Sequence, residues 1–238
     1  MHLLIDGGNS RAKWVLHQDG QFIARGIWHY QQPYPWAELP KPQRVLFASV
    51  ANPDFDQRLA RWLYQHWQLS LERVQAQAEQ CGVRCAYAQP HTLGVDRWLA
   101  LLGARQLGLG DCCLIDCGTA VTVDLLRQDG QHLGGVIFPG AQLMRQALYQ
   151  NTQRIPAEES LFAGIAGQTT RDCVAGGTTQ AVIGALEHIC AQARLQLSSQ
   201  LQCVITGGGA QELLPYLSAD YQHQPDLIFH GLRALVLE

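Results

Sequence analysis

A short segment near the start of the chain combines glycines with charged residues in a way that suits phosphate binding. It reads Asp6, Gly7, Gly8, Asn9, Ser10, Arg11, Ala12, Lys13. Glycine lets backbone N–H groups approach an anion closely, and the aspartate and lysine add a metal ligand and a positive charge. The segment therefore predicts a site for a phosphate with a metal ion, and an ordinary β-turn is the alternative. It lacks G-x-x-x-x-G-K-[ST], so it is not a Walker-type loop.

The surroundings of this segment are repeated later in the chain. Residues 4–10 return 110 positions later as residues 114–120, where the turn reads Asp116-Cys117-Gly118-Thr119-Ala120. Each copy is an apolar run with a polar turn, followed by two further β-prone runs. We interpret the copies as two related three-stranded meanders. Two such turns facing each other would hold a polyphosphate from both sides.

Two further segments place reactive groups or glycines at the ends of predicted elements. Gly94-Val95-Asp96-Arg97 puts an acid in the first turn of a predicted helix beside a guanidinium, although an acid is favoured there by the helix dipole alone. Gly207-Gly208-Gly209 follows a predicted strand and precedes a helix, so a base or a ribose could approach the backbone. A plain strand-to-helix turn explains that run equally well.

The elements that must position these residues follow from periodicity. Strands are predicted at residues 12–17, 22–28, 45–50, 121–126, 132–138 and 203–206. Asn52-Pro53 should begin a helix with an apolar face that includes Phe55, Leu59 and Leu63, and further helices are predicted at residues 96–107, 178–189 and 211–217. The order of several strands followed by a helix occurs twice along the chain. This order predicts an α/β fold with a duplicated core, divided into residues 1–109 and 110–238.

Composition excludes several classes of protein. The chain has 238 residues, a net charge of −3 and 47% hydrophobic residues, which indicates a globular protein. No Lys/Arg-rich run is present, so nucleic acid is not an expected partner. No apolar stretch is long enough for a membrane span, and the first residues do not resemble a signal peptide, so no membrane partner and a cytoplasmic location are expected.

Four ordered motifs resemble those of the type III pantothenate kinases. D-x-G-N-[TS]-x-x-K matches residues 6–13, G-x-D-R matches 94–97, D-x-G-T-A-x-T matches 116–122 and G-G-x-I-x-P-G matches 134–140. That family belongs to the superfamily of acetate and sugar kinases, Hsc70 and actin. The resemblance implies duplicated ribonuclease H-like (actin-like ATPase) domains, with mixed sheets flanked by helices and an ATP cleft between the halves. Ser10 keeps the hydroxyl of the commoner threonine, and Val95 fills a position that is often small.

The resemblance also implies roles for individual residues. It implies ATP-dependent phosphorylation of pantothenate, the first step of coenzyme A biosynthesis, with Asp96 as general base. ATP with Mg²⁺ would bind Asp6, Gly7, Gly8, Asn9, Ser10, Arg11, Ala12, Lys13 and Thr119. Pantothenate would bind Tyr87, Gly94, Val95, Asp96, Arg97 and Thr178, the last across a homodimer. The resemblance further implies that Asp116 holds a monovalent cation, K⁺ or NH₄⁺.

Several alternatives remain open beside this interpretation. Thr178 and Thr179 both fit the substrate-binding threonine, and Thr178 keeps the family's spacing to Ala181. Another small-molecule kinase of the same superfamily would share both turns. A nucleotide-binding regulatory relative without catalysis is a third possibility, which the presence of Asp6, Lys13, Asp96 and Asp116 disfavours.

Overall fold

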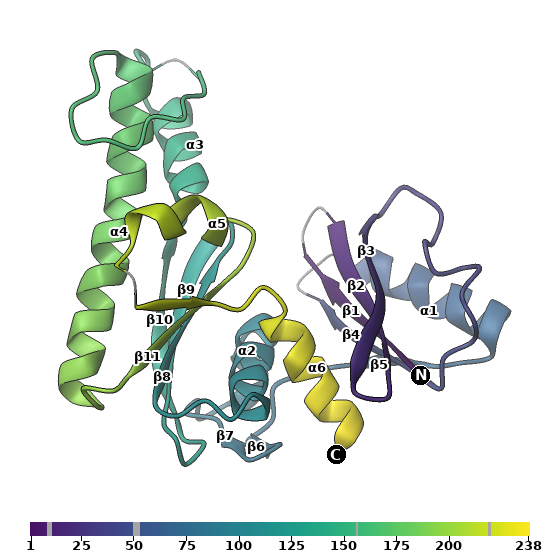
Figure 1. The fold of residues 1–238 in the computed structure, drawn as a ribbon. Helices are drawn as coiled ribbons and strands as arrows, with labels where there is room; N and C mark the ends of the chain where they lie inside the picture. Colours follow the sequence, from purple (N-terminus) through teal and green to yellow (C-terminus); the bar gives the residue numbers. More distant parts are fainter. Residues whose placement is uncertain (9–10, 50–52, 156, 219) are drawn as a thin grey trace. The chain divides into compact units, whose positions relative to one another are not determined.

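The chain folds into two compact units. The computed structural model describes residues 1–8, 11–49, 53–155, 157–218 and 220–238. One unit is Met1–Gly108 together with Asp226–Glu238, and the other is Leu109–Pro225 (Figure 1). The predicted halves, 1–109 and 110–238, differ from these units chiefly at the C-terminus, because the last helix packs in the first unit rather than the second.

The first unit contains a mixed five-stranded sheet. Its strands lie in the order β3 (Gln21–His29), β2 (Arg11–Gln18), β1 (His2–Gly7), β4 (Arg44–Ser49) and β5 (Leu71–Arg73). β2 runs antiparallel to β1 and β3, whereas β4 runs parallel to β1 and β5. A small hairpin of β6 (Glu79–Gln80) and β7 (Val83–Arg84) stands apart from this sheet.

The second unit repeats this sheet. Its order is β10 (His132–Pro139), β9 (Ala120–Leu126), β8 (Cys112–Cys117), β11 (Gln202–Thr206) and β12 (Tyr221–His223). The strand directions also match, because β9 is antiparallel to β8 and β10, and β11 is parallel to β8 and β12. The common order and directions confirm the duplicated α/β fold that the repeated sequence predicts.

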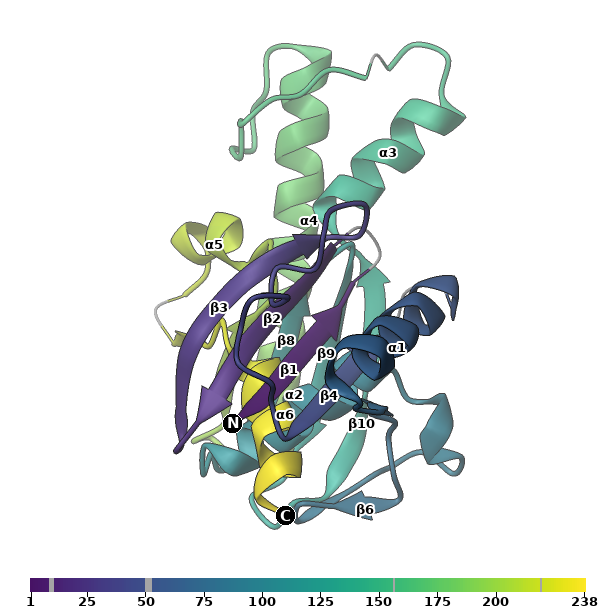
Figure 2. The same cartoon turned by 90° about the vertical axis from the view of Figure 1, so that its right-hand side faces the viewer.

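Helices pack on both faces of the first sheet (Figure 2). Helix α1 (Pro53–Trp67) buries Phe55, Leu59 and Leu63 against the face that carries Leu3 and Ile5. Leu4 points to the opposite face because side chains alternate along a strand. On that side, α6 (Leu227–Leu237) contacts β1 and α2 (Val95–Gln106) contacts β4. A 3₁₀ turn, η1 (Pro90–Thr92), leads into α2.

Two glycines explain why the C-terminal helix belongs to the first unit. A Cβ on Gly103 of α2 would collide with the Leu227 carbonyl oxygen, and a Cβ on Gly231 of α6 would collide with the Leu99 carbonyl oxygen. The pairing of Leu99 with Gly231 and Gly103 with Leu227 shows that the helices run antiparallel. Their backbones are in direct contact, a packing that side chains at these positions would prevent.

The second unit carries one long helix and a projecting arm. Helix α4 (Thr170–Gln196) buries Val182, Leu186 and Cys190 against the second sheet. The helical arm consists of the first turns of α4, helix α3 (Ala141–Asn151) and the described connecting residues 152–155 and 157–169. It extends beyond the end of the sheet in both ribbon views (Figures 1 and 2). The unit is completed by α5 (Ala210–Leu213) and η2 (Leu214–Tyr216).

The start of α4 has a local cause. The Thr169 hydroxyl accepts a hydrogen bond from the Asp172 backbone N–H at 3.2 Å, and a second hydrogen bond of 2.7 Å joins it to the Asp172 carboxylate. This cap satisfies a backbone donor at the helix N-terminus, and hydrogen bonds from Ser160 and Thr169 lower the pKa of Asp172. The helix therefore begins eight residues before the predicted 178–189 stretch. Within the described ranges, no helix has the length and apolar character needed to cross a membrane.

Candidate active site

The first glycine turn joins β1 to β2. Asp6 and Lys13 are directly paired across these antiparallel strands, as are Gly7 and Ala12. The Gly8 N–H donates to the Arg11 carbonyl at 3.1 Å and closes the turn. Asn9 and Ser10, both predicted to bind ATP, lie outside the described residues. The strand pairing thus places the predicted carboxylate and ammonium groups at the same end of the hairpin.

Tyr30, the residue after the end of β3, supports this turn. Its hydroxyl donates to the Gly8 carbonyl. Burial, followed by the negative charges of Asp6 and Asp56, raises the pKa of Tyr30 to about 12. The phenol is therefore protonated at neutral pH, so the hydrogen bond to Gly8 is retained.

Gly7 is required by close packing rather than by an unusual backbone angle. A Cβ at this position would lie 2.9 Å from the Phe47 ring on β4. Gly7 is also the parallel-strand partner of Ser49, the last residue of β4. The start of the first turn therefore lies directly beside the end of β4.

The G-x-D-R segment forms the start of α2. Gly94 precedes the helix, and Asp96 lies in its first turn as predicted. The Asp96 Oδ1 accepts a hydrogen bond from the Arg97 backbone N–H at 2.8 Å. A Cβ on Gly94 would lie 2.6 Å from that same oxygen. Gly94 thus leaves the space in which the Asp96 carboxylate rests.

Tyr87 and Arg97 are brought together, although ten residues separate them. The Arg97 Nη1 donates to the Tyr87 hydroxyl at 2.9 Å, and the guanidinium carbon lies 5.7 Å from the centre of the tyrosine ring. Arg97 is buried, whereas Tyr87 is partly exposed. The predicted substrate residues of the first unit thus form one cluster at the N-terminus of α2.

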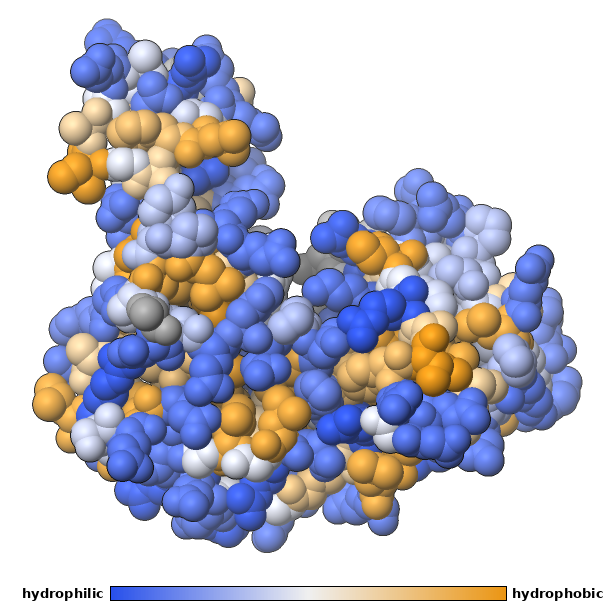
Figure 3. Space-filling view, viewed as in Figure 1, coloured by the Kyte–Doolittle hydropathy of each residue, from blue (hydrophilic) through white to orange (hydrophobic). Residues whose placement is uncertain are grey.

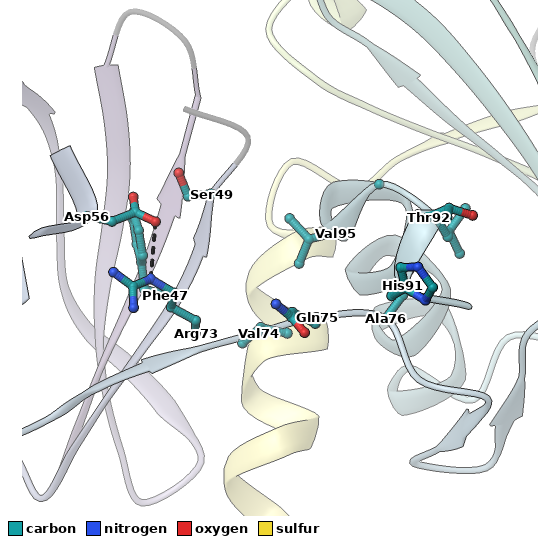
Figure 4. A pocket seen from close by; sticks show the side chains of 12 residues that line it. Phe47, Ser49, Asp56, Arg73, Val74, Gln75, Ala76, His91, Thr92 and Val95 are labelled. Carbon is teal, nitrogen blue, oxygen red and sulfur yellow. Dashed lines mark hydrogen bonds and ion pairs between the residues drawn. The ribbon is translucent and has the colours of Figure 1, made fainter. Parts of the chain in front are cut away.

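A pocket of about 590 Å³ adjoins this cluster (Figure 4). Val95, His91 and Thr92 lie on one side of it, and Ser49, Asp56 and Arg73 lie on the other. The Arg73 Nε donates to the Asp56 Oδ2 at 3.1 Å. The sequence interpretation missed most of these residues. Ser49 had a usable signal, since ligands of open α/β sheets bind beyond the carboxyl ends of the strands.

The aspartate of the second glycine turn has different cross-strand partners from that of the first. Asp116 lies between Thr122 on β9 and Thr206 on β11 as its cross-strand partners. The side chains of directly paired residues share one face of a sheet, so two hydroxyl groups flank the carboxylate. No group of three or more acidic, histidine or cysteine side chains suited to a metal ion occurs among the described residues.

Three glycines from two other segments of the chain contact this second turn. The Gly140 N–H donates to the Thr119 carbonyl at 2.9 Å, and the Gly209 N–H donates to the Cys117 carbonyl at 2.8 Å. Gly207 has φ +93°, and a Cβ there would collide with the Asp116 carboxylate. The motifs at residues 134–140 and 207–209 therefore hold the turn that carries Asp116 and Thr119.

Thr178 lies on α4 in the helical arm. Its hydroxyl donates to the Val174 carbonyl at 2.8 Å and accepts from the Arg145 Nε at 2.9 Å. Thr179 accepts from the Arg145 Nη2 at 3.0 Å. Both threonines are buried. Sequence interpretation missed Arg145, because its partners are more than thirty residues away and on another helix.

Comparison with known proteins identifies relatives along nearly the whole chain. The family model for type III pantothenate kinase matches residues 2–192. The type III pantothenate kinase of Nitrosococcus oceani is 36% identical, with 98% of this chain and 92% of that protein covered.

Solved structures show the same fold at lower identity. A protein from Campylobacter jejuni, assigned to the Baf family of transcriptional activators, has a TM-score of 0.63 at 22% identity and covers 99% of this chain and 97% of its own. The activator of 2-hydroxyisocaproyl-CoA dehydratase from Clostridium difficile has a TM-score of 0.51 at 12% identity, covering 99% and 96%. These two likenesses concern the fold alone. The family match and the sequence relative together show that this chain belongs to the type III pantothenate kinase family.

Proposed function

We propose that this protein transfers the γ-phosphoryl group of ATP to the primary hydroxyl of pantothenate, the first step of coenzyme A biosynthesis. Membership of the family supports the reaction. The structural observation that carries the proposal is the gathering of Tyr87, Asp96 and Arg97 at the start of α2, beside a pocket sized for a small molecule. We place the reaction in the cytoplasm, where ATP is supplied.

Asp96 acts in this proposal as the general base. Its carboxylate orients the primary hydroxyl of pantothenate and takes the proton as the oxygen forms its bond to the γ-phosphorus. The bond between that phosphorus and the bridging oxygen breaks, and ADP leaves. Phosphoryl transfer depends mainly on alignment and charge neutralisation, so a fixed carboxylate suits the task. The hydrogen bond from Arg97 and the space at Gly94 fix it.

The first turn binds the phosphates of ATP in this scheme. Gly7 and Gly8 bring the backbone close to the phosphates, and Lys13 supplies a positive charge opposite Asp6. Asp6 fits Mg²⁺, which in proteins is often held by one or two carboxylates together with substrate phosphates. Bound Mg²⁺ would neutralise phosphate charge. Thr119 of the second turn is exposed and is proposed to contact ATP as well.

Asp116 is proposed to hold a monovalent cation, K⁺ or NH₄⁺. Its cross-strand partners Thr122 and Thr206 add hydroxyl oxygens to the carboxylate, so the donors available are all oxygen atoms. Oxygen ligands suit hard cations, and a single carboxylate matches a single positive charge. The cation would supply positive charge beside the second turn.

A homodimer is proposed to form through the helical arm. An apolar groove of about 770 Å³ runs between α3 and α4 and includes Leu143, Met144 and Thr178. Leu161 and Ile165 on the same arm are almost fully exposed, and apolar side chains gather on this part of the surface (Figure 3). Exposed apolar surface of this kind is typical of protein interfaces. Pairing of two arms would cover it and bring Thr178 to the substrate of the neighbouring subunit.

The test is a substrate panel with purified protein and ATP. We expect product with pantothenate and none with acetate or common sugars, because Tyr87 and the G-x-D-R segment follow the pattern of this family. Faster turnover of a sugar or acetate would favour another kinase of the superfamily. ATP binding without turnover of any acceptor would favour a regulatory relative.

A further inference from the structure

Tyr30 holds one of the two glycines of the first turn by a bond that the hairpin itself does not need. The Gly8 N–H donates to the Arg11 carbonyl at 3.1 Å, and this bond closes the turn between the antiparallel strands. The Gly8 carbonyl accepts from the Tyr30 hydroxyl, a side chain 22 residues along the chain. Both polar groups of the Gly8 backbone therefore have a partner within the first unit.

The ring of Tyr30 is fixed by its aromatic neighbours. Its centre lies 4.0 Å from the ring centre of Phe55 on α1 and 5.6 Å from that of Trp28 on β3. Phe55 and Trp28 are both buried. A ring that packs against two buried rings has little freedom to move. The Tyr30 hydroxyl is therefore held at the Gly8 carbonyl by the core of the unit.

The same group of rings also holds the other glycine. The ring centre of Phe47 lies 6.0 Å from that of Phe55, and a Cβ on Gly7 would be 2.9 Å from the Phe47 ring. Phe47 thus packs on Gly7, while Tyr30 bonds to Gly8. The two contacts differ in kind, because only the one at Gly8 sets the direction of a peptide group.

The direction of the Gly8 carbonyl matters for an anion at this turn. A carbonyl oxygen carries partial negative charge and repels phosphate, whereas backbone N–H groups attract it. The carbonyl and the N–H of one planar trans peptide group point in opposite directions, so holding the carbonyl orients the whole group. This inference rests on the proposed function, in which the first turn binds the phosphates of ATP. We infer that Tyr30 is a positioning residue that orients the first turn for those phosphates.

The charges around Tyr30 keep its hydroxyl a donor. Burial, then the negative charges of Asp6 and Asp56, raises its pKa to about 12. A phenolate could only accept hydrogen bonds and would repel the Gly8 carbonyl. The bond to Gly8 is thus retained throughout the neutral range, and the turn is already ordered before ATP arrives. Ordering a binding loop in advance raises affinity because the bound ligand does not have to supply that ordering.

The experiment measures the affinity of Tyr30→Phe for a non-hydrolysable ATP analogue with Mg²⁺ and for adenosine, which has no phosphates. The substitution removes the hydroxyl and keeps the ring. Isothermal titration should give a Kd for the analogue about threefold to tenfold above that of the wild type, as expected for loss of one neutral hydrogen bond. The Kd for adenosine, measured by competition with the analogue, should stay unchanged. The KM for pantothenate should stay unchanged as well.

Tyr34→Phe is the matched control. Tyr34 belongs to the same group of rings, with its centre 4.7 Å from that of Trp28, and its hydroxyl has no hydrogen bond to the first turn among the described residues. This variant should bind both ligands as the wild type does. Unchanged affinity of Tyr30→Phe for the analogue overturns the inference. Equal weakening of the analogue and adenosine, or an equal loss in Tyr34→Phe, indicates a general packing role and overturns it as well.

Folding and catalysis are checked in the same series. If Tyr30→Phe does not fold, Tyr30→Met takes its place, since methionine adapts to irregular apolar space and offers no donor there, and the same rise in Kd is expected. A wild-type protein that binds the analogue but forms no product from pantothenate contradicts the proposed function, while the titrations still decide the role of Tyr30. A wild-type protein that does not bind the analogue overturns the inference.

Discussion

The carboxylate of Asp96 lies where a side chain on Gly94 would have to be. A Cβ at position 94 would be 2.6 Å from Asp96 Oδ1, and that oxygen accepts the Arg97 backbone N–H at 2.8 Å. Because it has no side chain, the glycine of the G-x-D-R segment leaves room for the carboxylate of the acid two residues later. This explains the spacing of the motif in physical terms, since Gly94 itself needs no unusual backbone angle.

Gly94→Ala should displace the Asp96 carboxylate while leaving the fold intact. We expect kcat for pantothenate to fall about a hundredfold, the cost of moving a catalytic group by roughly 1 Å. Steady-state kinetics measures this, with Gly184→Ala as the control, because the space around Gly184 in α4 is open. Full activity in Gly94→Ala would show that the position of Asp96 does not depend on the glycine.

Asp6→Asn should weaken nucleotide binding as well as turnover. Asp6 is paired with Lys13 at the first turn and is proposed to hold Mg²⁺ with the ATP phosphates. Isothermal titration with a non-hydrolysable ATP analogue and Mg²⁺ should show at least about a tenfold higher Kd. The exposed Asp19→Asn, at the opposite end of the hairpin, should bind as the wild type does. Unchanged affinity in Asp6→Asn would remove Asp6 from the ATP site.

Asp116→Asn should abolish activation by monovalent cations. The wild-type protein is expected to turn over faster in potassium or ammonium buffer than in sodium buffer, because the carboxylate between Thr122 and Thr206 attracts the cation. The variant should have the same low rate in all three. A wild-type rate that is indifferent to the cation would contradict this assignment, as would a variant that keeps the full activation.

His17 should make the protein less stable in mildly acidic solution. It is buried on β2, and neither ring nitrogen has a hydrogen-bond partner among the described residues. Burial, then the positive charges of Arg233 and the N-terminus, lowers its pKa below the ordinary value of 6.5. As the pH falls, His17 is therefore protonated in the unfolded chain before it is protonated in the folded protein. The contribution of His17 to the unfolding free energy is complete above about pH 6.5 and is lost as the pH falls through that value toward the lower folded pKa.

Urea unfolding at about pH 8 and about pH 5.5 measures this effect. His17→Gln should show a smaller loss of unfolding free energy between the two pH values than the wild type. A residual loss is expected because burial also lowers the pKa of His2 and His230. The exposed His29→Gln is the matched control and should behave as the wild type. Equal pH dependence in His17→Gln and the wild type would contradict the assignment.

The sequence was most informative where structure is local or repeated. The repeat of residues 4–10 at 114–120 predicts two similar three-stranded meanders, because each copy places a glycine turn between antiparallel strands. The first three strands of each sheet, β1–β3 and β8–β10, do form such a meander. The apolar spacing of Phe55, Leu59 and Leu63 likewise predicts the buried face of α1. Each of these features depends on a pattern within a few residues or on the repetition of such a pattern, so the sequence reveals it.

Features that depend on distant parts of the chain were not predictable in this way. The contact of Gly103 with α6 joins segments more than 120 residues apart, and no periodicity in either helix indicates it. Arg145 appears in the sequence as one more helix-surface arginine until the fold places it against Thr178 and Thr179. The pairing of Arg73 with Asp56 similarly results from the return of the chain from α1 to β5.

The most direct test of the central claim is product formation from ATP and pantothenate by the wild-type protein and Asp96→Asn. Mass spectrometry should detect 4'-phosphopantothenate with the wild type, in an amount equal to the ADP formed. In Asp96→Asn, kcat should fall about 10² to 10⁴-fold while ATP binding stays nearly intact. No phosphopantothenate from the wild type would contradict the proposed function. Turnover by Asp96→Asn within about threefold of the wild type would contradict the role of Asp96 as the base.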